Sequence, residues 1–314
     1  MMKSLGLRRS GLLGLAVSTA VSLMPAFAQA PTPYAKINAD AAADPIEVTS
    51  LRGGISFLAG SGGNIAVLAG SDGLLMVDAG IAVSEQKVDA VLQRLKPGPI
   101  SYLINTHWHW DHTDGNAWVN KRGAVIIAHP NTAKHLGETI RVEEWGHTFK
   151  PVTADARPTV MVPAEKRMQF DGDTVVMRHY GPAHTDGDLS VYFTKADVLF
   201  TGDTWWNGLY PFIDYVAGGS IDGMITAANA NIEMVSERTQ VAPGHGPVGG
   251  RADLVEYRDM LVSIRNRVAE LKTGQVAPAS DLGETDGALR RQVGSVDHQP
   301  RPFHHPGLPG RPSR

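Results

Sequence analysis

The stretch Asn105-Thr106-His107-Trp108-His109-Trp110-Asp111-His112 places four side chains that can bind a metal within six residues. It follows residues 100–105, an apolar run that predicts a strand, so it lies on the loop at the carboxyl end of that strand. A histidine in a protein core usually stands alone, whereas these polar side chains alternate with two tryptophans. Imidazole and carboxylate ligands without a thiolate favour Zn²⁺, with iron or manganese as alternatives. The stretch therefore predicts a metal site.

Three further polar side chains lie on later loops, among glycine, proline and small residues that turn the backbone sharply: His184, Asp203 and His245. Each comes after a run that predicts a strand, namely residues 175–180, 198–200 and 240–242. Together with the first stretch they provide seven ligands at strand ends. Seven ligands are enough for two metal ions and a carboxylate that bridges them.

Short β-prone runs broken by glycine, followed by a helical pattern, occur in both halves of the chain. The predicted strands are residues 55–58, 64–69, 74–77, 100–105 and 125–128, then 175–180, 190–193, 198–200 and 240–242. The predicted helices are residues 83–95, 221–235 and 254–271. This order predicts an α/β fold, a four-layer αββα sandwich with the helices outside and two sheets inside. Residues 138–165 have no clear period, so we expect a functional loop or lid there.

The His-x-His-x-Asp-His run, the three later ligands and the strand end Val77-Asp78-Ala79-Gly80 resemble the metallo-β-lactamase fold superfamily over roughly residues 46–271. The resemblance implies a metal centre at one edge, between the two sheets. It implies that His107, His109 and His184 hold the first metal, that Asp111, His112 and His245 hold the second, and that Asp203 bridges them. Asp78 matches a position that orients a ligand. Equally, it reads as a turn residue at a strand end.

A pair of zinc ions implies hydrolysis. The ions would lower the pKa of a shared water, and the resulting bridging hydroxide would attack the carbonyl of a small ester, thioester, lactone or lactam. Asp111 is the catalytic candidate, because it would orient the hydroxide and carry a proton besides binding metal. We expect an apolar substrate pocket formed by aromatic residues near the ligands, although such residues more often belong to a core. These candidates are Trp205, Trp206, Tyr210, Phe212 and Trp110, with Trp145 and Tyr215 nearby.

Two other functions stay open. A genuine periplasmic metallo-β-lactamase that hydrolyses β-lactam antibiotics is the first alternative, favoured by His112 and disfavoured by the bridging Asp203. A zinc-binding protein without turnover is the second, but a structural site usually closes around one metal. Exported localisation argues against a glutathione thioester as substrate.

The N-terminus resembles a secretory signal. Lys3, Arg8 and Arg9 precede the uncharged residues 11–24, and Ala26-Phe27-Ala28 offers a cleavage site after Ala28. The apolar run is shorter than the about 20 residues that span a bilayer. We therefore expect residues 1–28 to be a signal peptide and the mature protein to be periplasmic or secreted, with no membrane contact after cleavage.

The remaining organisation and the partners follow from composition. We expect an N-terminal arm at residues 29–45, a hydrolase domain at 46–276 and a disordered tail at 277–314, which is polar and rich in proline. The 314 residues include no cysteine, which excludes a disulfide scaffold, an iron–sulfur protein and a cysteine nucleophile. The net charge of −3 gives no basic field for nucleic acid. We expect a small-molecule substrate and a monomer.

Overall fold

The computed structural model describes residues 30–274, and from Thr32 onward these form one compact unit. The signal peptide at 1–28 and the tail at 277–314 lie outside the described residues and stay predictions. Within residues 30–274 no helix is both long and apolar enough to cross a membrane.

The first sheet contains seven strands in the order β1-β2-β3-β4-β5-β6-β9. Its strands are β1 (Glu47–Ser50), β2 (Ile55–Ala59), β3 (Ile65–Gly70), β4 (Gly73–Val77), β5 (Ile100–Ile104), β6 (Val125–Ala128) and β9 (Val160–Met161). Pairing is antiparallel from β1 to β4 and parallel from β4 to β9. The tight β3–β4 turn needs Gly73, whose φ of 110° is open to glycine. The parallel strands bring their carboxyl ends to one edge.

The second sheet has five strands in the order β10-β11-β12-β13-β14. They are β10 (Glu165–Phe170), β11 (Asp173–Arg178), β12 (Ser190–Phe193), β13 (Val198–Phe200) and β14 (Gln240–Ala242). Only β13 and β14 pair in parallel. The central core lies between the sheets, where Ile55, Phe57 and Leu75 of the first meet Phe193 and Phe200 of the second.

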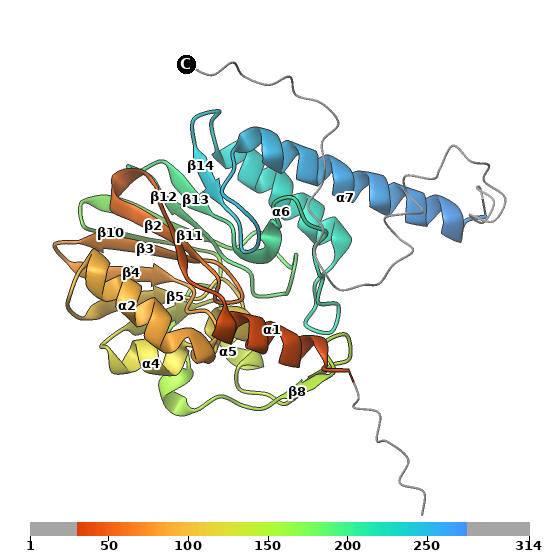
Figure 1. Cartoon of the computed structure of the whole chain (residues 1–314). Helices are drawn as coiled ribbons and strands as arrows, with labels where there is room; N and C mark the ends of the chain where they lie inside the picture. Colours follow the sequence, from red (N-terminus) through yellow and green to blue (C-terminus); the bar gives the residue numbers. More distant parts are fainter. Residues whose placement is uncertain (1–29, 275–314) are drawn as a thin grey trace, which may run out of the picture. The chain divides into compact units, whose positions relative to one another are not determined.

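Helices cover the outer faces of both sheets (Figure 1). The α-helices are α1 (Pro33–Ala43), α2 (Glu85–Leu95), α3 (Trp110–Thr113), α4 (Asn116–Lys121), α5 (Pro130–His135), α6 (Ile221–Met234) and α7 (Arg251–Lys272). The 3₁₀ turns are η1 (Arg52–Gly54), η2 (Ala82–Ser84), η3 (Ala154–Ala156) and η4 (Gly202–Thr204). α2 buries Val88, Val91 and Leu92 against the first sheet, at the spacing that predicted it. The expected αββα arrangement is confirmed.

Two segments carry more structure than we expected. Residues 138–165 contain the hairpin β7 (Ile140–Val142) and β8 (His147–Phe149), then η3 and the edge strand β9. These strands have two or three residues, too few to show a period. The expected N-terminal arm contains α1, which Thr32 caps by accepting a hydrogen bond from the Ala35 N–H at 3.2 Å.

Candidate metal centre

The carboxyl ends of four strands position the predicted ligands. His107 and His109 lie on the loop after β5, and the single turn of α3 carries Asp111 and His112. The other three come after β11, β13 and β14 respectively: His184, Asp203 in η4, and His245. The structure thus brings together all seven residues in two groups that could hold metal ions. Their roles as ligands stay predictions that the experiments below address.

The first group consists of His107, His109, His184 and Asp203, all buried, with ligand atoms within 4.8 Å of one another. His109 Nδ1 lies 2.9 Å from His184 Nε2. Asp203 Oδ2 lies 3.4 Å from His184 Nε2 and 3.8 Å from His107 Nε2. Three imidazole nitrogens and one carboxylate oxygen therefore converge on one point.

The second group consists of Asp111, His112 and His245. His245 Nε2 lies 3.2 Å from Asp111 Oδ2 and 3.4 Å from His112 Nε2. Asp203 also reaches this group, with Oδ1 at 3.1 Å from His112 Nε2 and Oδ2 at 3.3 Å from His245 Nε2. Asp203 therefore lies between the two groups, as the resemblance implied for a bridging carboxylate.

The residues fit a pair of divalent cations. His107 Nε2 is buried and has no hydrogen-bond partner among the described residues. A buried polar atom without a partner is costly, and it calls for an ion or another polar group beside it. A donor set of imidazole and carboxylate suits zinc and other divalent transition metals. Neither group needs a thiolate.

Four of the five histidines in the two groups are fixed through the other ring nitrogen. His112 Nδ1–H donates to Asp78 at 2.8 Å, and His107 Nδ1–H donates to the Thr106 hydroxyl at 3.0 Å. That hydroxyl donates to Asp78 at 2.7 Å, so Asp78 supports one histidine in each group. Asp78 also lies at the turn that follows β4, with a φ of 63°. It is therefore a turn residue as well as a hydrogen-bond partner of a candidate ligand.

Two further partners were not apparent from the sequence. His109 Nε2–H donates to Asp214 at 3.0 Å, and His184 Nδ1–H donates to the Phe212 carbonyl at 2.8 Å. Asp214 stands alone in an irregular loop, without a spacing that links it to His109. Its only sequence signal is a carboxylate placed shortly after Asp203. Such partners set the tautomer and orientation of a metal ligand.

Buried charges shift the pKa values within the centre in opposite directions. Burial raises the pKa of Asp203, but His245, His112 and His107 outweigh it and hold that pKa well below its usual range. Burial lowers the pKa of His245, whereas Asp203 and Asp111 raise it to about 9. Burial, followed by His112, lowers the pKa of His107 far below its usual value. The ionised carboxylates give the centre the negative charge that attracts a cation.

The expected aromatic pocket is present only in part. Trp206 is half-buried, with its ring centroid 4.2 Å from that of His245, and Phe212 lies 5.9 Å from His109. Tyr210 is 47% exposed on the same loop. Trp110 corrects the expectation, because it is a buried core residue at 6% exposure, whereas Trp205, at 0% exposure, belongs to the core and also lines the cleft described below. Trp205 packs with α6 and α7, whereas Trp110 packs against α1.

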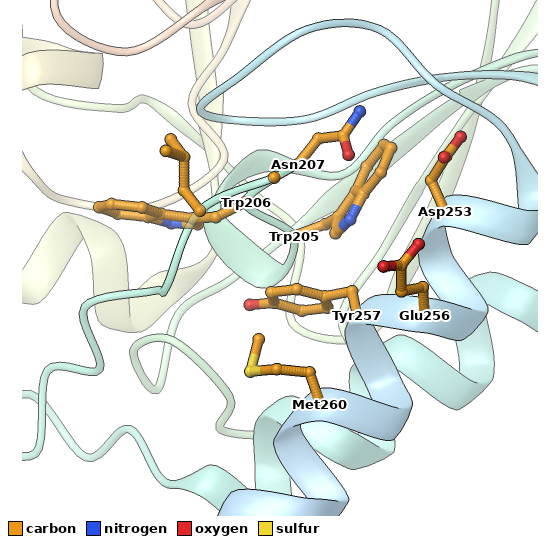
Figure 2. A pocket seen from close by; sticks show the side chains of 9 residues that line it. Trp205, Trp206, Asn207, Asp253, Glu256, Tyr257 and Met260 are labelled. Carbon is orange, nitrogen blue, oxygen red and sulfur yellow. The ribbon is translucent and has the colours of Figure 1, made fainter. Parts of the chain in front are cut away.

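A separate cleft of about 210 Å³ lies between the loop at residues 205–209 and α7. Figure 2 shows Tyr257 and Met260 of α7 on the side of this cleft opposite Trp206. Trp206 therefore has His245 as one neighbour and this cleft as the other. Trp205 also lines this cleft, and a substrate-binding role for either tryptophan stays a prediction.

Comparison with known proteins gives a consistent assignment. The profile of the metallo-beta-lactamase superfamily matches residues 58–270. The probable metallo-hydrolase YqgX of Bacillus subtilis is 23% identical over 167 residues, 51% of this chain and 75% of that protein. A hydroxyacylglutathione hydrolase of a Polaromonas species is 30% identical over 145 residues, 39% of this chain and 52% of that protein. The chain thus spans about half the length of that relative.

Solved structures show the same fold. The sec-alkylsulfatase Pisa1 from a Pseudomonas species aligns with a TM-score of 0.59 at 17% identity, over 78% of this chain and 46% of that one. The DIM-1 metallo-beta-lactamase aligns with a TM-score of 0.55 at 19% identity, over 70% and 99% of the two chains. At such identities the likeness concerns the fold. Together with the family profile and the His/Asp groups, it shows that the chain belongs to the metallo-beta-lactamase superfamily and is a metal-dependent hydrolase of that superfamily.

Proposed function

We propose that the protein is a binuclear zinc hydrolase that cleaves a small ester, thioester, lactone or lactam at its carbonyl carbon. The observation that carries this proposal is the position of Asp203, whose two carboxylate oxygens lie within 3.4 Å of His184, His112 and His245. One carboxylate shared by two ligand groups supports two ions held side by side. Zinc at such a centre supplies a Lewis acid for the carbonyl and makes a water molecule more acidic.

The residues of the chain supply the remaining roles. The first group is sealed, since the side chains of His107 and His184 are at most 1% exposed. The second group is more open, with His245 at 18% and Asp111 at 10%. We therefore propose that substrate approaches from the second group. Asp111 would accept a hydrogen bond from the attacking water there and pass its proton on.

The relatives support the carbonyl chemistry and leave the substrate open. A hydroxyacylglutathione hydrolase is among the curated proteins similar to this chain. The β-lactam reading is the second candidate, favoured by the Asp111, His112 and His245 set that forms the second group. A centre that binds zinc without turnover is the outcome that would remove both readings.

The test is hydrolysis by the full chain loaded with zinc, with and without a chelator. The substrates are p-nitrophenyl butanoate, a thioester, a γ-lactone and a chromogenic cephalosporin. Asp111→Ala should abolish turnover, and Glu47→Ala, an exposed carboxylate on β1, should leave it unchanged. Turnover of the cephalosporin alone would establish the second candidate. A protein that holds two zinc ions and cleaves none of the four would overturn the proposal.

A further inference from the structure

The metal centre has an aromatic wall on the side of His109. The Trp145 ring lies 4.7 Å from the His109 ring, edge to face, and 4.8 Å from the Phe212 ring. Phe212 also contacts His184, at 6.2 Å between ring centroids. Both aromatic side chains are only partly buried, unlike Trp108 beneath them, which is 3% exposed. Partly exposed apolar surface beside polar ligands is typical of a surface that a ligand covers.

Trp145 is carried by the β7–β8 hairpin, which joins neither large sheet. Its turn closes with the Gly146 N–H donating to the Glu143 carbonyl at 2.9 Å. Gly146 has a φ of 62°, and a Cβ there would come within 2.9 Å of Thr32. An isolated two-stranded hairpin is marginally stable, so its position depends on what packs against it.

Helix α1 supplies that support through Tyr34. The Tyr34 N–H donates to the Trp145 carbonyl at 3.3 Å. The Tyr34 ring stacks on His147 of the same hairpin, with centroids 3.6 Å apart and planes at 12°. It also contacts Trp110 and Phe149, at 5.2 and 5.7 Å. One residue of α1 therefore touches the turn and one strand of the hairpin.

The other end of α1 is anchored to the body of the fold. The Ser84 hydroxyl and the Lys87 ammonium both donate to the Ala41 carbonyl, at 2.9 and 2.6 Å. Ala41 is buried beside Ile81. Helix α1 therefore contacts the hairpin near its first residues and η2 and α2 near its last.

We propose that Trp145 and Phe212 bind the apolar acyl portion of the substrate, and that Tyr34 positions Trp145 for this contact. The inference deepens the proposed function and rests on it for the identity of the reacting group. It names an uncharged alkyl or aryl acyl chain as the substrate feature that the wall selects. Trp145 is thus a specificity-determining residue, and Tyr34 is a positioning residue that does not touch the substrate.

The test measures binding, so that it does not depend on turnover. Calorimetry measures the affinity of the zinc-loaded full chain for acetate, butanoate, hexanoate and octanoate. These are the carboxylate products of acyl ester cleavage. An alkyl chain of the ligand that lies against the aromatic wall on one side should gain about twofold in affinity for each added CH₂ group. This gain corresponds to about half of the free energy of burying a CH₂ group fully. Trp145→Ala should remove this dependence on chain length, and Trp145→Phe should keep part of it.

Variants of Tyr34 separate positioning from general stability. Tyr34→Ala should weaken the dependence, whereas Tyr34→Phe should keep it, because the stacked ring and the backbone N–H remain. Val268→Ala, an apolar residue of α7 that is 49% exposed, is the control and should change nothing. The melting temperatures of all five variants should be recorded beside their affinities.

The outcomes separate the inference from the proposed function. A wild type without chain-length dependence, or a Trp145→Ala protein with the wild-type dependence, overturns the inference. If the wild type cleaves none of the four test substrates but shows a chain-length dependence that Trp145→Ala abolishes, the inference is supported and the proposed function is contradicted. If Tyr34→Phe loses the dependence on chain length as fully as Tyr34→Ala does, the positioning role of Tyr34 is overturned.

Discussion

The carboxylate of Asp214 lies 3.0 Å from Nε2 of His109, the ring nitrogen opposite the one that faces His184. Asp214 is fixed in turn, because its Oδ1 accepts a hydrogen bond from the Ala217 N–H at 2.9 Å. The contact keeps the proton of His109 on Nε2 and leaves Nδ1 free for the metal group. Sites of this kind weaken when the outer carboxylate is lost.

Asp214→Asn should therefore lower the zinc affinity of the first group by about 10- to 100-fold. The amide oxygen still accepts from His109, but it lacks the charge that makes the imidazole a stronger ligand. Competition with a fluorescent chelator measures the affinity of each site. Asp222→Asn, an exposed carboxylate in the first turn of α6, is the matched control. An unchanged affinity in Asp214→Asn would show that the contact only packs the loop.

The two groups should lose metal separately. Asp111→Ala removes one oxygen ligand from the second group and leaves the four side chains of the first in place. We expect its zinc content to fall from about two ions to about one per chain after dialysis. Elemental analysis of the dialysed protein gives the ratio. Loss of both ions would mean that the groups form one cooperative site.

Metal removal should destabilise the whole fold, because both groups join loops of the two sheets. Binding only to the folded state adds about 4 kcal/mol when free zinc exceeds its Kd about 1,000-fold. At this chain length that corresponds to a rise in Tm of roughly 10 °C. Differential scanning calorimetry with zinc and with chelator measures the difference. Equal melting temperatures would contradict a zinc site shared between the sheets.

The main elements and the ligands could be predicted because their signals are local. Each candidate ligand follows a strand. Apolar runs of three or four residues predict the exact first and last residues of several strands. The predicted strands at 125–128, 190–193, 198–200 and 240–242 coincide with β6, β12, β13 and β14. Polar side chains at the ends of such runs converge whenever the strands share an edge.

The unpredicted parts depend on contacts between distant residues. The strands β7 and β8 are three residues long and take their order from α1, more than 100 positions earlier in the chain. The pairing of Asp214 with His109 joins residues 105 positions apart. Trp205 and Trp206 are neighbours in sequence and both line the cleft beside α7, yet Trp205 is fully buried in the core cluster and Trp206 is only half-buried beside His245. Composition treats them alike, and only packing separates them.

The last prediction concerns Asp188, which orders the loop of His184. Its carboxylate accepts hydrogen bonds from the Thr185 N–H, at 2.9 Å for Oδ2, and from the Thr185 hydroxyl at 2.6 Å. Burial raises the pKa of Asp188 to about 6, although His184 and these hydrogen bonds act against burial. In the unfolded chain the same group has a pKa near its ordinary value of about 3.9.

The folded state therefore binds more protons at Asp188 than the unfolded state between pH 4 and pH 6. Stability from this group is greatest below pH 4 and is lost as the pH rises through about 6. Asp188→Asn cannot titrate, so the free energy of unfolding of the wild type relative to this variant should fall with pH. The full shift corresponds to about 3 kcal/mol. Urea unfolding of both proteins in chelator, from pH 4.5 to 7.5, measures it. A difference that is constant or grows with pH would show that Asp188 stays ionised throughout.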